Sequence, residues 1–201
     1  MRPLTSSRGR LPDGTPYGVY EVLGRKVRVL DSLRNGVLAE EVIRDPLFEP
    51  EERAAIVCEL VFPDPGRFAE AFGDEAGEAV LGVLEAAFGF SDGSDDRVLD
   101  FEEDAARIRA TARAAYGLSP DELSAMPFSE AVELLAMAPR DTPVGQALYY
   151  RTSEPPKRTK SNGDQVDAWL EAREHYRIKG DRGEEDANAA ATAMFDRLAG
   201  D

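Results

Sequence analysis

In this 201-residue chain, the side chains best suited to chemistry are oxygen donors near the middle of the chain, which lead into and begin a predicted helix. They follow the first, third, fifth, ninth and twelfth positions of an EF-hand-like calcium loop, in the order Asp92, Ser94, Asp96, Asp100 and Glu103. Arg97 stands at the sixth position, where that loop needs glycine for its sharp turn, and it brings a positive charge. We therefore favour an acidic linker that leads into a capped helix, and keep calcium as the alternative.

Other catalytic or metal-binding chemistry has little support in the sequence. His175 is the single histidine and lies in a charged helical segment, which favours a solvated helix face over a general base. Cys58 is the single cysteine and lies in an apolar pattern, which favours a buried structural thiol. One histidine and one cysteine make a zinc site implausible, and no glycine-rich phosphate loop occurs. The sequence thus predicts a protein without a catalytic site or cofactor.

The amino-acid composition of the chain argues against two classes of binding partner, nucleic acids and membranes. The chain has 39 acidic and 24 basic residues and a net charge of −15, which argues against nonspecific binding to nucleic acid. No apolar run reaches the length that spans a bilayer, so we expect a cytoplasmic protein without a membrane partner. The charge is polarised along the chain, because residues 1–35 carry more bases than acids.

The clearest helix signals lie between residues 100 and 152. Asp100 and Glu103 form a capping-box pair, which predicts a helix that begins there. Apolar residues then recur at spacings of three and four, as one helix face requires, and are Phe101, Ala105, Ile108, Ala112 and Tyr116. Gly117 suits the end of this helix, since glycine accepts the left-handed conformation of a helix C-terminus.

Further helices follow at once. Ser119 and Pro120 predict a short second helix, which Pro127 interrupts. A third apolar stripe begins at Phe128, and Thr142 with Pro143 caps a fourth segment. Amphipathic helices with such tight connections predict a helical hairpin or small bundle.

The rest of the chain completes a mainly α fold, a compact helical bundle with a small N-terminal β-hairpin. Residues 1–16 are predicted to be a mobile arm, 17–152 the hairpin and helical core domain, and 153–201 a linker with a C-terminal helical tail. Helices are expected at 33–44, 50–62, one or two within 66–90, 164–178 with Trp169, and 187–198.

Several of these residues, in their order and spacing, resemble a family of tailed bacteriophages, the gene-product-fifteen-like family. In the central region the resemblance lies in Asp100, Phe101, Asp104, Ile108, Tyr116, Gly117, Asp141, Thr142, Tyr150 and Arg151. Outside it, the segments 46–47, 60–63 and 155–176 are also similar. The chain departs from the family at Met126-Pro127-Phe128, where the family tends to carry a tryptophan-rich patch.

The resemblance implies a function in phage or prophage tail assembly, without catalysis. We expect a chaperone that keeps the long, helical tape measure protein soluble until the tail tube protein polymerises around it, in the cytoplasm of the bacterial host. The expected partners are the tape measure protein, other tail proteins and further copies of this chain. The expected contact surfaces are the unpacked apolar faces of 101–116 and 128–138 and the tail 153–198. A structural tail or connector subunit and a small acidic regulatory protein are the alternatives.

Overall fold

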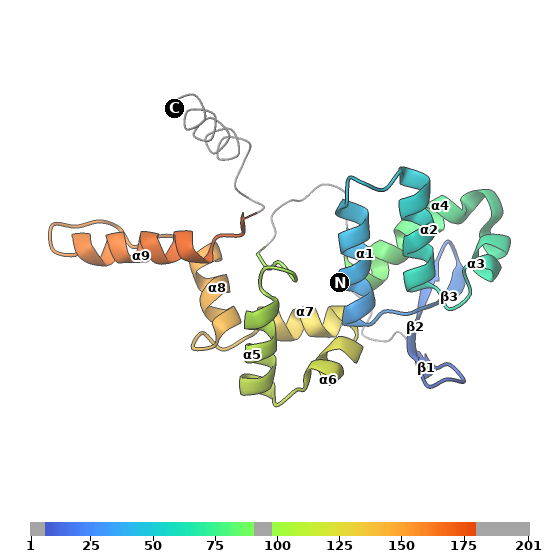
Figure 1. Ribbon diagram of the computed structural model, residues 1–201, viewed down its shortest axis with the longest axis horizontal. Helices are drawn as coiled ribbons and strands as arrows, with labels where there is room; N and C mark the ends of the chain where they lie inside the picture. The colour runs from blue at the N-terminus through green and yellow to red at the C-terminus, as the bar shows by residue number, and fades with distance from the viewer. Residues whose placement is uncertain (1–6, 91–97, 180–201) are drawn as a thin grey trace, which may run out of the picture. The chain divides into compact units, whose positions relative to one another are not determined.

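The chain is mainly helical, with a small antiparallel sheet at its N-terminal end (Figure 1), and this confirms the predicted fold class. The computed structural model describes residues 7–90 and 98–179. Within them the chain divides into two compact units: the first comprises 7–90 and 112–137, and the second comprises 98–111 and 138–179. The boundaries between the units fall inside the predicted core domain 17–152.

The sheet of the first unit has three strands, not the two of the predicted hairpin. Its order is β1-β2-β3, with β1 (Arg8–Arg10), β2 (Pro16–Val22) and β3 (Arg25–Val29). The predicted mobile arm is therefore wrong over Arg8–Arg10, which pairs with Pro16–Gly18. The reason is a distant contact: the Arg8 guanidinium donates hydrogen bonds of 3.0 and 2.8 Å to the carboxylate of Asp31, which is 1% exposed.

Serine caps precede two of the helices of the first unit. They are α1 (Leu33–Arg44), α2 (Pro50–Val61), α3 (Pro65–Phe72), the 3₁₀ turn η1 (Gly73–Glu75), α4 (Ala76–Val83), the π turn η2 (Leu84–Phe88), α6 (Pro120–Ala125) and α7 (Phe128–Ala136). Ser32 Oγ accepts the Asn35 N–H at 3.2 Å, and Ser119 and Glu122 form a reciprocal capping box. The predicted helices at 33–44 and 50–62 are confirmed.

Backbone contacts join the start of α1 to the start of α7. The Leu33 N–H donates to the Met126 carbonyl at 2.7 Å, and the Phe128 N–H donates to the Asp31 carbonyl at 2.8 Å. These bonds place the Phe128 ring against α1, where a Cβ at Gly36 would lie 2.2 Å from its Cδ2. Phe128 also meets Phe88 edge to face, with ring centroids 5.6 Å apart. Phe128 is thus a core residue of the first unit.

The second unit contains the N-terminal part of α5 (Ala105–Tyr116), α8 (Pro143–Thr152) and α9 (Gly163–Tyr176). Thr142 caps α8 as predicted, and α9 corresponds to the predicted helix 164–178. The connector between α8 and α9 has mostly exposed residues, and the predicted helix 187–198 lies outside the described residues. No helix within 7–90 or 98–179 combines the length and the apolar character needed to cross a bilayer.

Candidate functional site: a buried aspartate–arginine network

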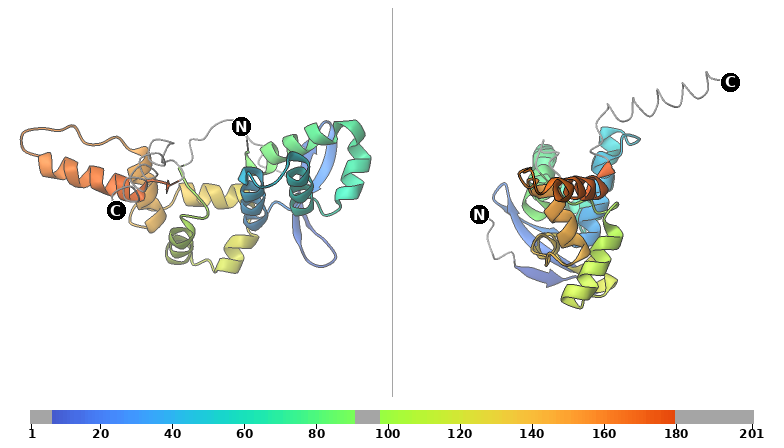
Figure 2. Two further views of the ribbon diagram at one scale, coloured as in Figure 1. Left: turned by 45° about the horizontal axis from the view of Figure 1, so that its top comes forward. Right: turned by 90° about the vertical axis from the view of Figure 1, so that its left-hand side faces the viewer.

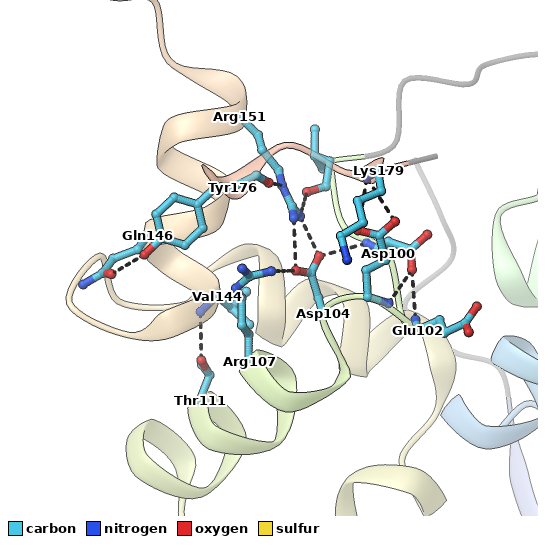
Figure 3. Close-up of polar contacts among 12 residues, drawn as sticks. Asp100, Glu102, Asp104, Arg107, Thr111, Val144, Gln146, Arg151, Tyr176 and Lys179 are labelled. Carbon is cyan, nitrogen blue, oxygen red and sulfur yellow. Dashed lines mark hydrogen bonds and ion pairs between the residues drawn. The ribbon is translucent and has the colours of Figure 1, made fainter. Parts of the chain in front are cut away.

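The carboxylate of Asp104 is the centre of a hydrogen-bond network in the second unit (Figure 3). It is 0% exposed, and the α8 residue Arg151 clamps it through both carboxylate oxygens. Arg151 Nη1 donates to Oδ2 at 2.6 Å, and Nη2 donates to Oδ1 at 3.0 Å. Arg107, one turn further along α5, donates to Oδ1 at 2.6 Å. Such paired contacts between a guanidinium and a carboxylate are among the strong, directional hydrogen bonds of proteins.

Arg151 also binds two backbone carbonyl oxygens. Its Nε donates to the Tyr176 carbonyl at 2.5 Å, at the end of α9, and its Nη1 donates to the Val98 carbonyl at 3.0 Å. The Arg151 side chain is only 7% exposed. One arginine therefore connects three separate segments of the second unit: the chain before α5, helix α8 and the end of α9.

The network keeps Asp104 ionised. Burial raises the pKa of this carboxyl group, but hydrogen bonds from Arg151, from the Asp100 backbone N–H and from Arg107 together lower it further than burial raises it. The resulting pKa lies below the ordinary value of an aspartate. A carboxylate that stays charged and is surrounded by donors is suited to hold segments together.

The N-terminus of α5 differs from its prediction, because Asp104 replaces Glu103 in the cap. The Asp100 Oδ1 accepts the backbone N–H groups of Glu102 and Glu103 at 3.0 and 2.8 Å, as a capping residue should. The Asp100 N–H, however, donates to Asp104 Oδ2 at 3.1 Å, while the Glu103 carboxylate accepts the Lys179 N–H. The regular helix consequently begins at Ala105, and its predicted start at 100 is wrong.

The structure describes two of the five candidate calcium ligands. Asp92, Ser94 and Asp96 lie outside the described residues. Asp100 and Glu103 are described, and both use carboxylate oxygens to accept backbone N–H groups. Across the described ranges 7–90 and 98–179, histidine, cysteine and acidic residues form no group of three or more that could hold a metal ion.

Aromatic rings lie beside the network. Tyr150 and Tyr176 are stacked, with centroids 5.4 Å apart and ring planes inclined by 4°, and Trp169 lies 5.8 Å from Tyr150. The Arg107 guanidinium lies 5.2 Å from the Tyr176 ring centroid. Trp169 is 7% exposed, and its Nε1 has no hydrogen-bond acceptor among the described residues. Arg107 is thus shared between the carboxylate and the aromatic stack.

The candidate site residues, most of which carry the family resemblance, are distributed over both units. Asp100, Asp104, Ile108, Thr142, Tyr150, Arg151 and Trp169 belong to the second unit, together with the half-buried Phe101 and the exposed Asp141. Tyr116 and Phe128 belong to the first unit, where the Tyr116 hydroxyl donates to the Leu134 carbonyl at 2.9 Å. The structure therefore places nine of these eleven residues in the second unit, and Asp100, Asp104 and Arg151 among them share one hydrogen-bond network.

Sequence reasoning missed two contributors to this region. Arg107 lies three residues after Asp104, and this spacing could have identified it as a partner. Thr111 is fully buried, and its Oγ1 accepts the Val144 N–H at 3.0 Å at the start of α8. Its partner lies 33 residues away, so no local pattern indicates the contact.

The chain was compared with models of protein families, with curated proteins and with solved structures, and none of the three comparisons found a match.

Proposed function

We propose that this chain is a phage or prophage tail assembly protein, a chaperone that binds the tape measure protein in the cytoplasm of the bacterial host. The family resemblance of the sequence suggests this function, and the mainly helical fold is compatible with it. The exposed methionine at the end of α7 is the structural observation on which the proposal rests. The function is one of binding, and it requires no catalytic residue.

Helix α7 has a packed face and an unpacked end. Phe128, Ala131 and Leu135 are buried in the first unit. Leu134 is half-buried, and Met137, three residues after it, is 82% exposed. Residues three apart lie on the same side of a helix, so Leu134 and Met137 present apolar surface at the C-terminal end of α7.

An exposed methionine suits a partner made of many similar helices. Its unbranched, polarisable side chain adapts to differently shaped apolar surfaces, and methionine is frequent where a protein accepts varied helices. A tape measure protein would offer such amphipathic helices repeatedly, each with apolar residues at helical spacing. We therefore assign the contact to the C-terminal end of α7, within the predicted range 128–138.

Co-expression with the long helical protein encoded nearby tests this function. We expect that protein to be soluble only with this chain, and the two to co-elute in size-exclusion chromatography with light scattering. Met137→Asp should reduce co-elution, because a charge replaces the apolar contact. Leu47→Asp is the matched control, since Leu47 is 87% exposed and lies outside α7. An insoluble partner, or equal effects of both substitutions, would contradict the proposal.

A structural tail subunit is the second candidate, and the sheet favours it. β1 and β3 are the two edge strands in the order β1-β2-β3, and edge strands can pair with a neighbouring chain. Purified phage particles distinguish the candidates: a structural subunit remains in them, and an assembly chaperone does not. Mass spectrometry of the particles provides the measurement.

A further inference from the structure

The exposed side of α7 carries two carboxylates beside its methionine. Leu135 lies on the buried side of this helix, where it is 0% exposed. With about 100° between consecutive residues of a helix, Glu130, Glu133 and Met137 lie on the side opposite Leu135, and all three are exposed. Leu134 is half-buried at the border between the two sides. We call Glu130, Glu133, Leu134 and Met137 the α7 surface.

The charges of the α7 surface do not suit the helix that carries them. The C-terminal end of a helix is the negative end of its dipole, where lysine and arginine are favourable and acids are unfavourable. The last turn of α7 contains Glu133 and no base. Within residues 7–90 and 98–179, neither Glu130 nor Glu133 has an ion-pair partner. A cation supplied by a partner would therefore be attracted to this end of α7 by the carboxylates and by the helix dipole together.

The methionine and the carboxylates form one continuous surface. The Met137 N–H donates to the Glu133 carbonyl at 3.1 Å, so Met137 still belongs to the last turn of α7. Helical side chains lean toward the N-terminus of their helix, which places the Met137 side chain over the turn that contains Glu133 and Leu134. Figure 1 and the left view of Figure 2 show α7, in yellow, starting beside α1 and running away from it. The end that carries Met137 is thus the end distant from α1.

We propose that the α7 surface binds basic amphipathic helices, in which a lysine or arginine lies one turn from an apolar residue. The apolar residue of the partner packs on Met137 and Leu134, and its base pairs with Glu133 or Glu130. Side chains one turn apart on α7 match the same spacing on a second helix, which is how two helices pack. The inference rests on the proposed function, because it concerns the same contact, and it adds the charge of the helix that is bound.

A second copy of this chain fits the α7 surface less well than a basic helix does. A two-fold contact would place the acids of one α7 surface opposite the same acids of the other. Each copy also carries a net charge of −15. Like charges that face each other at an interface oppose binding. The charge of the surface therefore favours a basic partner over self-association.

The first experiment compares two synthetic helical peptides that have leucines at the same positions. One peptide has lysines one turn from the leucines, and the other has glutamates there. Fluorescence anisotropy of the labelled peptides measures their binding to the full chain. The lysine peptide should bind ~10-fold or more tightly than the glutamate peptide, and added salt should reduce the difference. Equal affinities for the two peptides would overturn the proposal.

Substitutions locate the binding on the chain. Glu133→Lys should weaken binding of the lysine peptide roughly 3- to 10-fold, because attraction becomes repulsion. Glu78→Lys is the matched control, since Glu78 is exposed on α4 and its substitution changes the net charge equally. Met137→Ser should weaken binding of the lysine peptide through the lost apolar contact. Equal effects of Glu133→Lys and Glu78→Lys would mean that the net charge alone attracts the peptide, and the proposal would be wrong.

Stability separates a lost contact from a damaged fold. Glu133→Lys should be at least as stable as the unsubstituted chain in thermal unfolding, because a base suits the C-terminal end of a helix. If Glu133→Lys does unfold, Glu133→Gln replaces it, and it should weaken binding of the lysine peptide without a change in fold. Co-elution of the protein encoded nearby, together with equal peptide affinities, would refute this inference and leave the proposed function standing. A preference for the lysine peptide without co-elution would support the inference and refute the proposed function.

Discussion

Replacing Arg151 with methionine should destabilise the second unit strongly. The substitution removes both hydrogen bonds from the Arg151 guanidinium to Asp104 and leaves the carbonyl oxygens of Val98 and Tyr176 without this donor. Methionine keeps much of the side-chain volume, so the main effect is electrostatic. A buried aspartate is left with Arg107 as its remaining cation.

The size of the loss follows from the partners that remain. Removing one member of a buried ion pair costs about 3–5 kcal/mol, since the other charge stays buried without its partner. Arg107 and the Asp100 N–H still donate to the carboxylate, so we expect the lower end, about 3 kcal/mol. Arg107→Met removes one charge-assisted bond and the contact with the Tyr176 ring at a partly exposed side chain, and should cost about 1–2 kcal/mol.

Trp169 provides the assay. It is the only tryptophan, it is buried, and it belongs to the second unit, so its fluorescence during urea unfolding reports on the unit that contains the network. With a denaturant slope of about 1–3 kcal/mol per molar, Arg151→Met should lower the midpoint by roughly 1–3 M. Arg140→Met is the control, because Arg140 is exposed and contacts the Tyr149 ring, and it should cost less than about 1 kcal/mol.

A double substitution separates the buried charge from other causes. If the unpaired carboxylate causes the loss, adding Asp104→Leu to Arg151→Met should recover part of the stability, since an apolar pair leaves no buried charge. Two results would refute this reasoning: a loss below about 1 kcal/mol for Arg151→Met, or a double variant no more stable than the single one.

Three further predictions concern acid, packing and thiol reactivity. The pKa of Asp104 is lower in the folded state than in the unfolded state, so its contribution to stability is complete above the unfolded-state pKa and is lost as the pH falls through the folded-state pKa. The urea midpoint of the chain should therefore fall on acidification. The midpoint of Asp104→Leu should fall less. Gly145→Ala should destabilise the fold by about 1–3 kcal/mol, because its Cβ would lie 2.1 Å from the Pro139 carbonyl oxygen. A Cβ at Gly77 would meet no atom within 4 Å, so Gly77→Ala should not destabilise the fold. Thermal unfolding of the two variants measures the difference. Burial raises the pKa of Cys58, so alkylation should require a higher pH in the folded chain than in the denatured chain, and identical pH profiles would contradict this.

Local signals in the sequence predicted much of the fold. Ser119 with Glu122, and Thr142 before Pro143, marked the starts of α6 and α8, since capping depends on residues within one turn. Strand β1 was not predicted, because its arginine-rich sequence resembles a mobile arm. Its ion pair with Asp31 spans 23 residues, and a local pattern carries no information on such a contact.

The same limit applies to the candidate site. Asp104 and Arg151 both carried the family resemblance, but they are 47 positions apart in the sequence, so no analysis of periodicity could show that they pair. The start of α5 was placed too early because Asp100, Glu103 and Asp104 all suit a helix N-terminus. In the structure the Glu103 carboxylate accepts the Lys179 N–H, a contact across 76 residues that no local pattern indicates.

The π turn η2 directly continues α4. At this turn the helix can lose one residue without a change in the residues that it buries. A π turn closes its hydrogen bonds over one more residue than an α turn, and is therefore equivalent to an α-helix with one residue inserted. Val83 and Phe88 are buried on either side of the exposed Ala86. Deleting Ala86 would convert the turn to regular α-helix and leave both residues in the core, whereas a deletion within α4 itself would rotate one side of the helix by about 100° relative to the other. A one-residue difference in length at this point is therefore compatible with an unchanged core.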